Sequence, residues 1–136
     1  MLTEELRIYR DTFKLCEILM RYQVGGVPKG DHPREMPKYV KHGVFQQTLD
    51  KALAALDSIY IANSYVTGRA SALGRYLENL GCARSRIRLM GEMEYLTVRQ
   101  QTNLMSLVDK CAKQATAWRK STQSESCDKQ ESEERK

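Results

Sequence analysis

Long apolar runs are missing from this sequence, which excludes a membrane-spanning segment. No stretch approaches the roughly 20 consecutive apolar residues that a membrane helix needs. The first ten residues, MLTEELRIYR, are charged where a secretory signal would be apolar. The sequence therefore predicts a protein of the cytoplasm with no membrane partner.

Paired cysteines and metal-ligand clusters are also missing. The four cysteines lie far apart without a C-x-x-C pair, so they predict neither a zinc site nor a disulfide framework. They are Cys16, Cys82, Cys111 and Cys127. We expect free thiols, with Cys16 and Cys111 buried. His32 and His42 lack a third ligand at suitable spacing, so no metal is predicted.

Catalytic signatures are equally scarce. The GGVPKG run at residues 25–30 lacks the G-x-x-x-x-G-K-[ST] pattern of a phosphate-binding loop. Asp50 and Asp57 lie seven residues apart on one predicted helix face, where carboxylates usually face solvent. No arrangement of Ser, His and Asp stands out. We expect no catalytic residue, no cofactor and no enzymatic activity.

Glycine, proline and aromatic residues are few, which favours helices over a sheet. The 136 residues include 8 Gly, 3 Pro and 7% aromatic residues, and the apolar residues are mostly Leu, Ala, Ile, Val and Met. Apolar residues recur three or four positions apart in four segments. The sequence predicts an all-α protein with helices at about residues 3–24, 38–65, 69–94 and 97–121.

The expected helix ends follow from capping and helix-breaking residues. Thr3 is the expected N-cap of the first helix, and Thr97 with Gln100 forms a candidate capping box for the fourth. All three prolines lie in residues 25–37, which we expect to form a surface loop. Residues 122–136 have no aliphatic or aromatic side chain and are expected to form a disordered tail.

Four amphipathic helices with these connections predict an up-down-up-down four-helix bundle formed by residues 1–121. The stripes expected to face its core include Phe13 and Met20 in the first helix. In the second helix they include Leu53 and Tyr60. One domain is therefore predicted, followed by a polar tail.

The chain is basic apart from that tail. Residues 122–136 hold five acids and three bases, so 19 of the 22 bases and 12 of the 17 acids belong to residues 1–121, a balance of about +7. A charge of this size attracts polyanions such as nucleic acid. Many basic proteins bind none, so charge alone leaves both possibilities open.

Arginines concentrate in the third predicted helix, where the guanidinium fork suits phosphate. Arg75 and Arg86 point away from the predicted apolar stripe, so phosphate contact and plain solvation explain them equally well. Arg84 and Arg88 lie at its edge, where a guanidinium needs a partner. The candidate partners are another chain or an internal acid, such as Glu17, Asp50 or Asp57.

A second basic group lies in and after the proline-containing segment. Lys38 and Lys41 belong to it and are candidate contacts for nucleic acid or a partner protein. The group also contains Lys29, His32, Arg34 and His42. A hydrated loop would show the same pattern.

Two segments resemble a known family. They are similar to the accessory variability determinant (Avd) proteins of diversity-generating retroelements, and comprise PKYVKHGVFQQTLDKALAAL (37–56) and ARSRIRLMGEMEYLTVRQQTNLMSLVDKCAKQATAWRKS (83–121). Avd proteins are relatives of the four-helix-bundle proteins encoded by intervening sequences in bacterial ribosomal RNA genes. The resemblance covers most of residues 5–121. The features that carry it are a Thr-led fourth helix, Arg84, Arg88, the aliphatic run to Leu96, and Trp118. Thr116 and Ala117 replace a frequent Gly-Gly, and the loop of residues 25–36 is longer than usual.

The resemblance implies a function. Avd proteins form a basic, ring-like pentamer of bundles that binds the reverse transcriptase and the template-repeat RNA and supports mutagenic homing, while the polymerase does the chemistry. The cDNA copied from the template is a second candidate ligand. By this resemblance Arg84 and Arg88, and more loosely Arg75 and Arg86, would meet RNA, reverse transcriptase or a neighbouring subunit. The alternative is an intervening-sequence-type bundle, a protein-interaction module without a reverse transcriptase partner.

Overall fold

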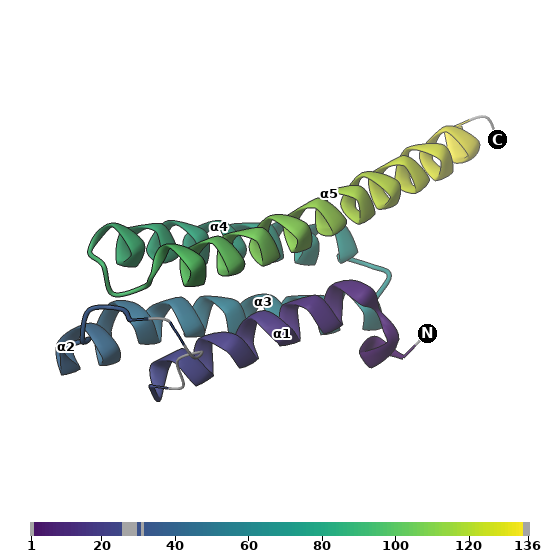
Figure 1. Cartoon of the computed structure of the whole chain (residues 1–136). Helices are drawn as coiled ribbons and strands as arrows, with labels where there is room; N and C mark the ends of the chain where they lie inside the picture. Colours follow the sequence, from purple (N-terminus) through teal and green to yellow (C-terminus); the bar gives the residue numbers. More distant parts are fainter. Residues whose placement is uncertain (1, 26–29, 31, 135–136) are drawn as a thin grey trace.

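The computed structural model describes residues 2–25, 30 and 32–134, with side chains described up to residue 123. Four long helices make up the chain, together with shorter helical turns (Figure 1). The helices are α1 (Arg7–Gln23), α2 (Lys38–Val40), α3 (Gln46–Ser64), α4 (Arg69–Glu92) and α5 (Val98–Glu134). None of the described residues forms a strand. The predicted all-helical class is confirmed.

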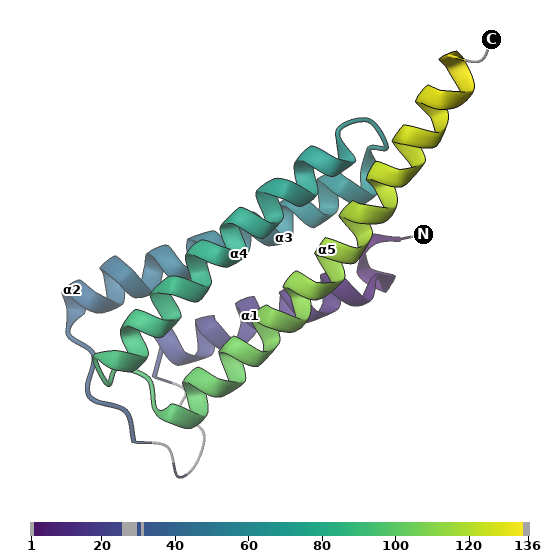
Figure 2. The same cartoon turned by 90° about the horizontal axis from the view of Figure 1, so that it is seen from above.

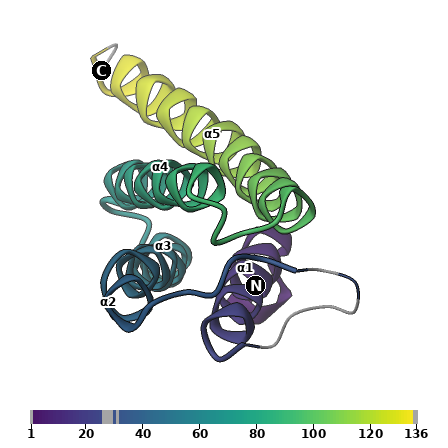
Figure 3. The same ribbon diagram turned by 60° about the vertical axis from the view of Figure 1, so that its left-hand side comes forward.

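The long helices alternate in direction and lie side by side as a bundle (Figures 2 and 3). Helix α1 lies beside α3 and α5, and α4 also lies beside α3 and α5, so α1 and α4 are diagonal to each other. Each helix therefore packs against the one that precedes or follows it in the chain, as expected for an up-down-up-down bundle.

The bundle core lies between all four long helices. It is formed by aliphatic and small residues with few aromatic rings, among them Leu15, Leu19, Phe45, Ile59, Leu73, Tyr76, Leu80, Ile87, Leu104 and Val108. Cys16 and Cys111 are buried and unpaired, as predicted, and Cys82 is also a free thiol. The side chain of Cys127 lies outside the described residues.

The core-facing stripes of α1 and α3 differ from the expected ones. Phe13 and Met20 are 52% and 53% exposed, and Leu53 and Tyr60 are 37% and 58% exposed. Each helix carries apolar residues over a wider arc than a four-helix bundle can bury. The packed arc of α1 is centred on Leu15 instead, so these four residues were wrongly placed in the core.

The sequence predicted N-terminal caps for two helices, α5 and α1. The capping box of α5 is confirmed, because the Gln100 N–H donates to Thr97 Oγ1 at 3.1 Å and the Thr97 N–H donates to Gln100 Oε1 at 2.9 Å. The predicted cap of α1 is wrong. Thr3 lies in a one-turn 3-10 helix (Thr3–Glu5), and Leu6 occupies the N-cap position. The Thr3 hydroxyl accepts a hydrogen bond from Asn63 Nδ2 at 2.9 Å instead.

The second predicted helix begins at Lys38 as expected but is not regular throughout. A π-helical turn, Lys41–Phe45, joins α2 to α3. The helix then ends at Ser64, one residue before the predicted boundary. Pro37 precedes the first turn in an extended conformation, as the loss of its N–H favours.

Helix α5 is longer than the sequence predicted. We expected it to end near Ser121 and residues 122–136 to be disordered, but the helix continues to Glu134 and extends past the other helices (Figures 1 and 2). Its 37 residues correspond to about 55 Å. Residues 122–134 contain no glycine or proline, and four Glu, two Gln and one Lys among them favour a helix.

Membrane spans were also sought in the structure. Across the described residues, no helix combines the length and the apolar character that crossing a bilayer requires.

Candidate nucleic-acid and partner interface

The predicted arginine pair lies on the flank of α4 that faces α5. Arg84 Nε donates to Asp109 Oδ1 of α5 at 2.9 Å, and Arg88 Nε lies 3.5 Å from Glu92 Oε1 one turn along α4. Both arginines are exposed. The expected internal acids, Glu17, Asp50 and Asp57, are therefore wrong as partners. The reason is that α5 borders this flank of α4, whereas Glu17 belongs to α1, diagonal to α4, and Asp50 and Asp57 belong to α3, the other neighbour of α4.

The other two predicted arginines lie on a different side of α4. Arg75 is exposed, and nine residues separate it from Arg84, which places the two about 180° apart around the helix. Arg86 is half-buried and donates from Nη1 to the Cys82 carbonyl at 3.2 Å. The four arginines therefore do not form one surface.

The lysines of the second basic group are placed at the α2 end of the bundle. Lys38 is exposed at the start of α2, and Lys41 is half-buried in the π-helical turn. Arg34, from the same group, lies nearby, with its guanidinium carbon 5.4 Å from the centroid of the Tyr95 ring. Lys29 lies outside the described residues.

The solvent-facing side of α5 carries bases that the sequence reading did not single out. Among residues 98–120 the one acid is Asp109, which already pairs with Arg84. The exposed bases of this stretch are Arg99, Lys110, Lys113 and Lys120. The absence of other acids over 23 residues was the signal available in the sequence. We call these four bases, with Arg84 and Arg88, the basic face.

The basic face is long and only partly neutralised. Arg99 and Lys120 are 21 residues apart, which corresponds to about 32 Å along α5. Three of its six bases have internal partners: Arg84 pairs with Asp109, Arg88 with Glu92, and Lys110 Nζ lies 3.7 Å from Asp11 Oδ2. The pairs of Arg84 and Arg88 are exposed on both sides and therefore contribute little energy.

Apolar side chains are exposed on the opposite pair of helices, α1 and α3. Phe13 and Met20 share one side of α1 because they are seven residues apart, and Leu53 and Tyr60 share one side of α3 for the same reason. We call these four residues the apolar face. The Phe13 ring lies 6.2 Å from that of Tyr9, centroid to centroid. A hollow of about 360 Å³ beside these rings is bordered by charged residues, among them Arg10, Lys14 and Glu17.

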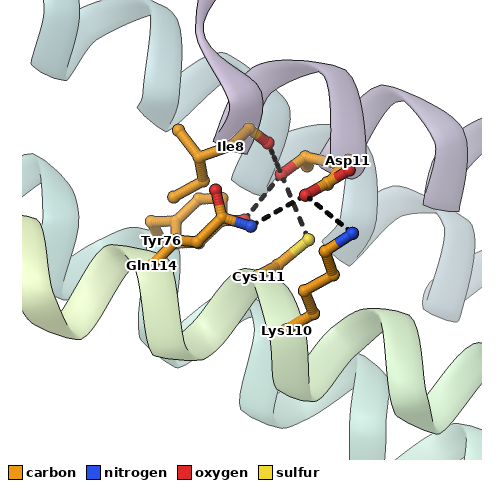
Figure 4. A network of polar contacts seen from close by, with 7 residues as sticks. Ile8, Asp11, Tyr76, Lys110, Cys111 and Gln114 are labelled. Carbon is orange, nitrogen blue, oxygen red and sulfur yellow. Dashed lines mark hydrogen bonds and ion pairs between the residues drawn. The ribbon is translucent and has the colours of Figure 1, made fainter.

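The interior of the bundle holds a network of polar contacts (Figure 4). Thr12 Oγ1 donates to the Ile8 carbonyl at 2.7 Å and lies 2.6 Å from the Tyr76 hydroxyl. Since the threonine has one hydroxyl proton, Tyr76 donates to Thr12. At the edge of this network, Asp11 Oδ2 accepts from Gln114 Nε2 at 2.7 Å. These contacts join α1 to α4 and α5.

The buried thiols are poor nucleophiles. Burial raises the pKa of Cys16 to about 12, and burial also raises the pKa of Cys111. Both stay protonated near neutral pH, whereas the thiolate is the reactive form of cysteine. In the part of the chain that the structure describes, no group of three or more His, Cys, Asp or Glu residues could hold a metal ion.

Trp118, one of the residues that carry the family resemblance, lies near the middle of α5. Its ring is half-buried and lies 5.6 Å from the Arg69 guanidinium carbon. Arg69 Nε also donates to the Ala62 carbonyl at 2.6 Å. Through these two contacts Arg69 links the connection between α3 and α4 to α5, which is a structural role.

A scan against protein-family models found no match, and a search of curated proteins found no significant relative. The functional argument therefore depends on the sequence resemblance and on the surfaces described above.

Proposed function

We propose that this chain is a non-catalytic accessory protein of a diversity-generating retroelement, binding its reverse transcriptase and template-repeat RNA during mutagenic cDNA synthesis. The observation that carries the RNA part is the basic face, in which four exposed bases follow α5 with a single, already paired acid among them. The reverse transcriptase part depends on the resemblance of residues 5–121 to Avd proteins.

The basic face suits a phosphate backbone better than a protein partner. Its bases are spread along about 32 Å of one helix and are not clustered around an apolar centre, whereas protein interfaces have such a centre with charges at the rim. Four phosphate contacts would make log affinity fall with log salt with a slope of about 3. A polyanion of repeating charge is therefore the ligand that this surface favours.

Self-association is the second part of the proposal, and the apolar face supports it. Its four side chains expose roughly 400 Å² of apolar surface, about the size of the largest patch on a typical monomer, which is often functional. Arg10 and Lys14 border it on α1, and Asp50 and Asp57 are exposed on α3. A second copy placed with its α3 against this α1 would therefore bring opposite charges together. By resemblance, the expected assembly is a ring-like pentamer.

The RNA proposal is tested with charge-matched double variants. Arg99→Gln with Lys113→Gln removes two bases of the basic face, and Arg7→Gln with Arg21→Gln removes two exposed bases of α1. We expect the first pair to weaken binding of the template-repeat RNA and to lower the salt slope by about 1.5. The second pair should leave the slope unchanged. Equal losses in both would show that net charge, not this face, attracts RNA.

The reverse transcriptase proposal is tested separately. Co-expression with a reverse transcriptase encoded beside this gene should give a complex that survives purification. RNA binding without any such complex would favour the intervening-sequence-type bundle.

A further inference from the structure

A hollow of about 370 Å³ lies at the α2 end of the bundle. Its walls come from the end of α1, residues 32–36, the π-helical turn and the connection from α4 to α5. The volume falls within the range of small-ligand pockets, roughly 300–1,000 Å³. Neither the family resemblance nor the basic face accounts for it.

The side chains around this hollow favour an anion with a planar part. Arg34, Lys41 and His32 are the basic side chains of its lining, and Glu35 is the acidic one. Tyr22 supplies aromatic surface, and the buried ring of Tyr95, 7% exposed, lies beneath the Arg34 guanidinium. Phosphate is well matched by an arginine and a lysine, and a base or other flat ring is well matched by aromatic and guanidinium planes.

Two unusual backbone features lie at or next to the lining of this hollow: one at Glu94, the residue before Tyr95, and one at Lys41. Among described residues other than glycine, Glu94 alone has a positive φ, 66°. This conformation costs of order 1 kcal/mol for a residue with a side chain and persists where the surroundings enforce it. The Glu94 carbonyl accepts from the Arg34 N–H at 2.8 Å, which fixes the Arg34 segment beside Tyr95.

The second feature is the π-helical turn, which begins at Lys41. Single π-helical turns inside α-helices are rare and occur often at functional sites. The Lys41 carbonyl accepts from Gln23 Nε2 at 3.3 Å, which ties the turn to the end of α1. Both cations of the hollow are therefore held by hydrogen bonds of their own backbone to neighbouring elements.

We propose that this hollow binds a nucleotide, with its phosphate between Arg34 and Lys41 and its base against the aromatic wall. This goes beyond the proposed function, because a free nucleotide needs neither the basic face nor a reverse transcriptase. The same chemistry is presented by a free mononucleotide and by the 5′-phosphorylated end of an RNA. The experiment separates these two sources.

Calorimetric titration of the full chain with adenosine 5′-monophosphate provides the test. We expect saturable binding of one nucleotide per chain, and at least tenfold weaker binding of adenosine, since hydrogen bonds to charged groups contribute about 1.5–3 kcal/mol. Arg34→Gln and Lys41→Gln should each weaken nucleotide binding about tenfold or more. Lys38→Gln, a matched loss of charge outside the hollow, should leave it unchanged.

The outcomes are separable from those of the RNA experiment. A 5′-phosphorylated oligoribonucleotide that displaces the nucleotide would identify an RNA end as ligand, whereas failure to displace it would identify a free nucleotide. No binding at millimolar nucleotide, equal binding of adenosine, or binding unchanged in both Arg34→Gln and Lys41→Gln would overturn the proposal. Circular dichroism of each variant checks that the helices are intact.

Discussion

Thr12 and Tyr76 form a fully buried polar pair whose energetics can be predicted in detail. Both residues are 0% exposed, and the Tyr76 hydroxyl donates to Thr12 Oγ1 at 2.6 Å. Thr12→Val keeps the size of the side chain but removes that acceptor. The remaining side-chain partner of the Tyr76 hydroxyl is Cys111 Sγ, a weak acceptor that does not replace the Thr12 oxygen.

The losses in free energy of unfolding caused by the two single substitutions should not add in the double variant. Thr12→Val leaves a buried hydroxyl without its partner, which costs about 2 kcal/mol. Tyr76→Phe removes the hydroxyl and leaves Thr12 bonded to the Ile8 carbonyl, so it costs about 1 kcal/mol. With both changes no polar group is stranded, so the double variant should cost about 1 kcal/mol, not the 3 kcal/mol of an additive sum.

Urea unfolding followed by circular dichroism measures the three free energies of unfolding. In thermal melts the Thr12→Val variant should lose about 6–10 °C, and the double variant about 3–5 °C. Thr12→Val costing no more than Tyr76→Phe would refute the reasoning. So would an additive double variant, because the hydrogen bond would then not couple the two sites.

Three further predictions concern pH, capping and assembly. Burial raises the pKa of Cys16 from 9.0 to about 12, so the unfolded state loses its thiol proton at a lower pH than the folded state does. The contribution of this thiol to the free energy of unfolding should therefore be fully present below pH 9 and should be lost between pH 9 and 12. Thermal melts across this range should show the fall, with a smaller slope in Cys16→Ala. Thr97→Ala removes the side-chain cap of α5 and should cost about 1 kcal/mol in urea unfolding, whereas Thr102→Ala on the exposed side should cost little. Phe13→Glu with Tyr60→Glu places charge on the apolar face and should shift sedimentation from oligomer to monomer; an unchanged mass would exclude this face as the contact.

Local features of the fold were predictable from the sequence. The capping box needs residues three apart, so Thr97 and Gln100 were enough to place the start of α5. The burial of Leu73, Ile87 and Leu104 followed from helical spacing. Helical spacing did not show which of two neighbouring apolar stripes faces the core, because the packed side of a helix depends on where the other helices lie. Phe13 was therefore assigned to the core although it is half exposed.

Features that depend on contacts between helices were not predictable. Asp109 lies 25 positions after Arg84 in the sequence, and only the side-by-side placement of α4 and α5 makes it the partner. The hollow beside Arg34 and Lys41 joins four separate segments, so no local pattern indicated it. The bases of α5 were visible in the sequence, but that they are all exposed on one side could be known only from the orientation of the helix in the bundle.

The central claim is most directly tested by measuring the mass of the purified chain with template-repeat RNA and reverse transcriptase, using light scattering after size exclusion at low and high salt. The account predicts an oligomer that joins both partners in one particle and releases RNA at high salt. A monomer that elutes apart from both partners at low salt would contradict it.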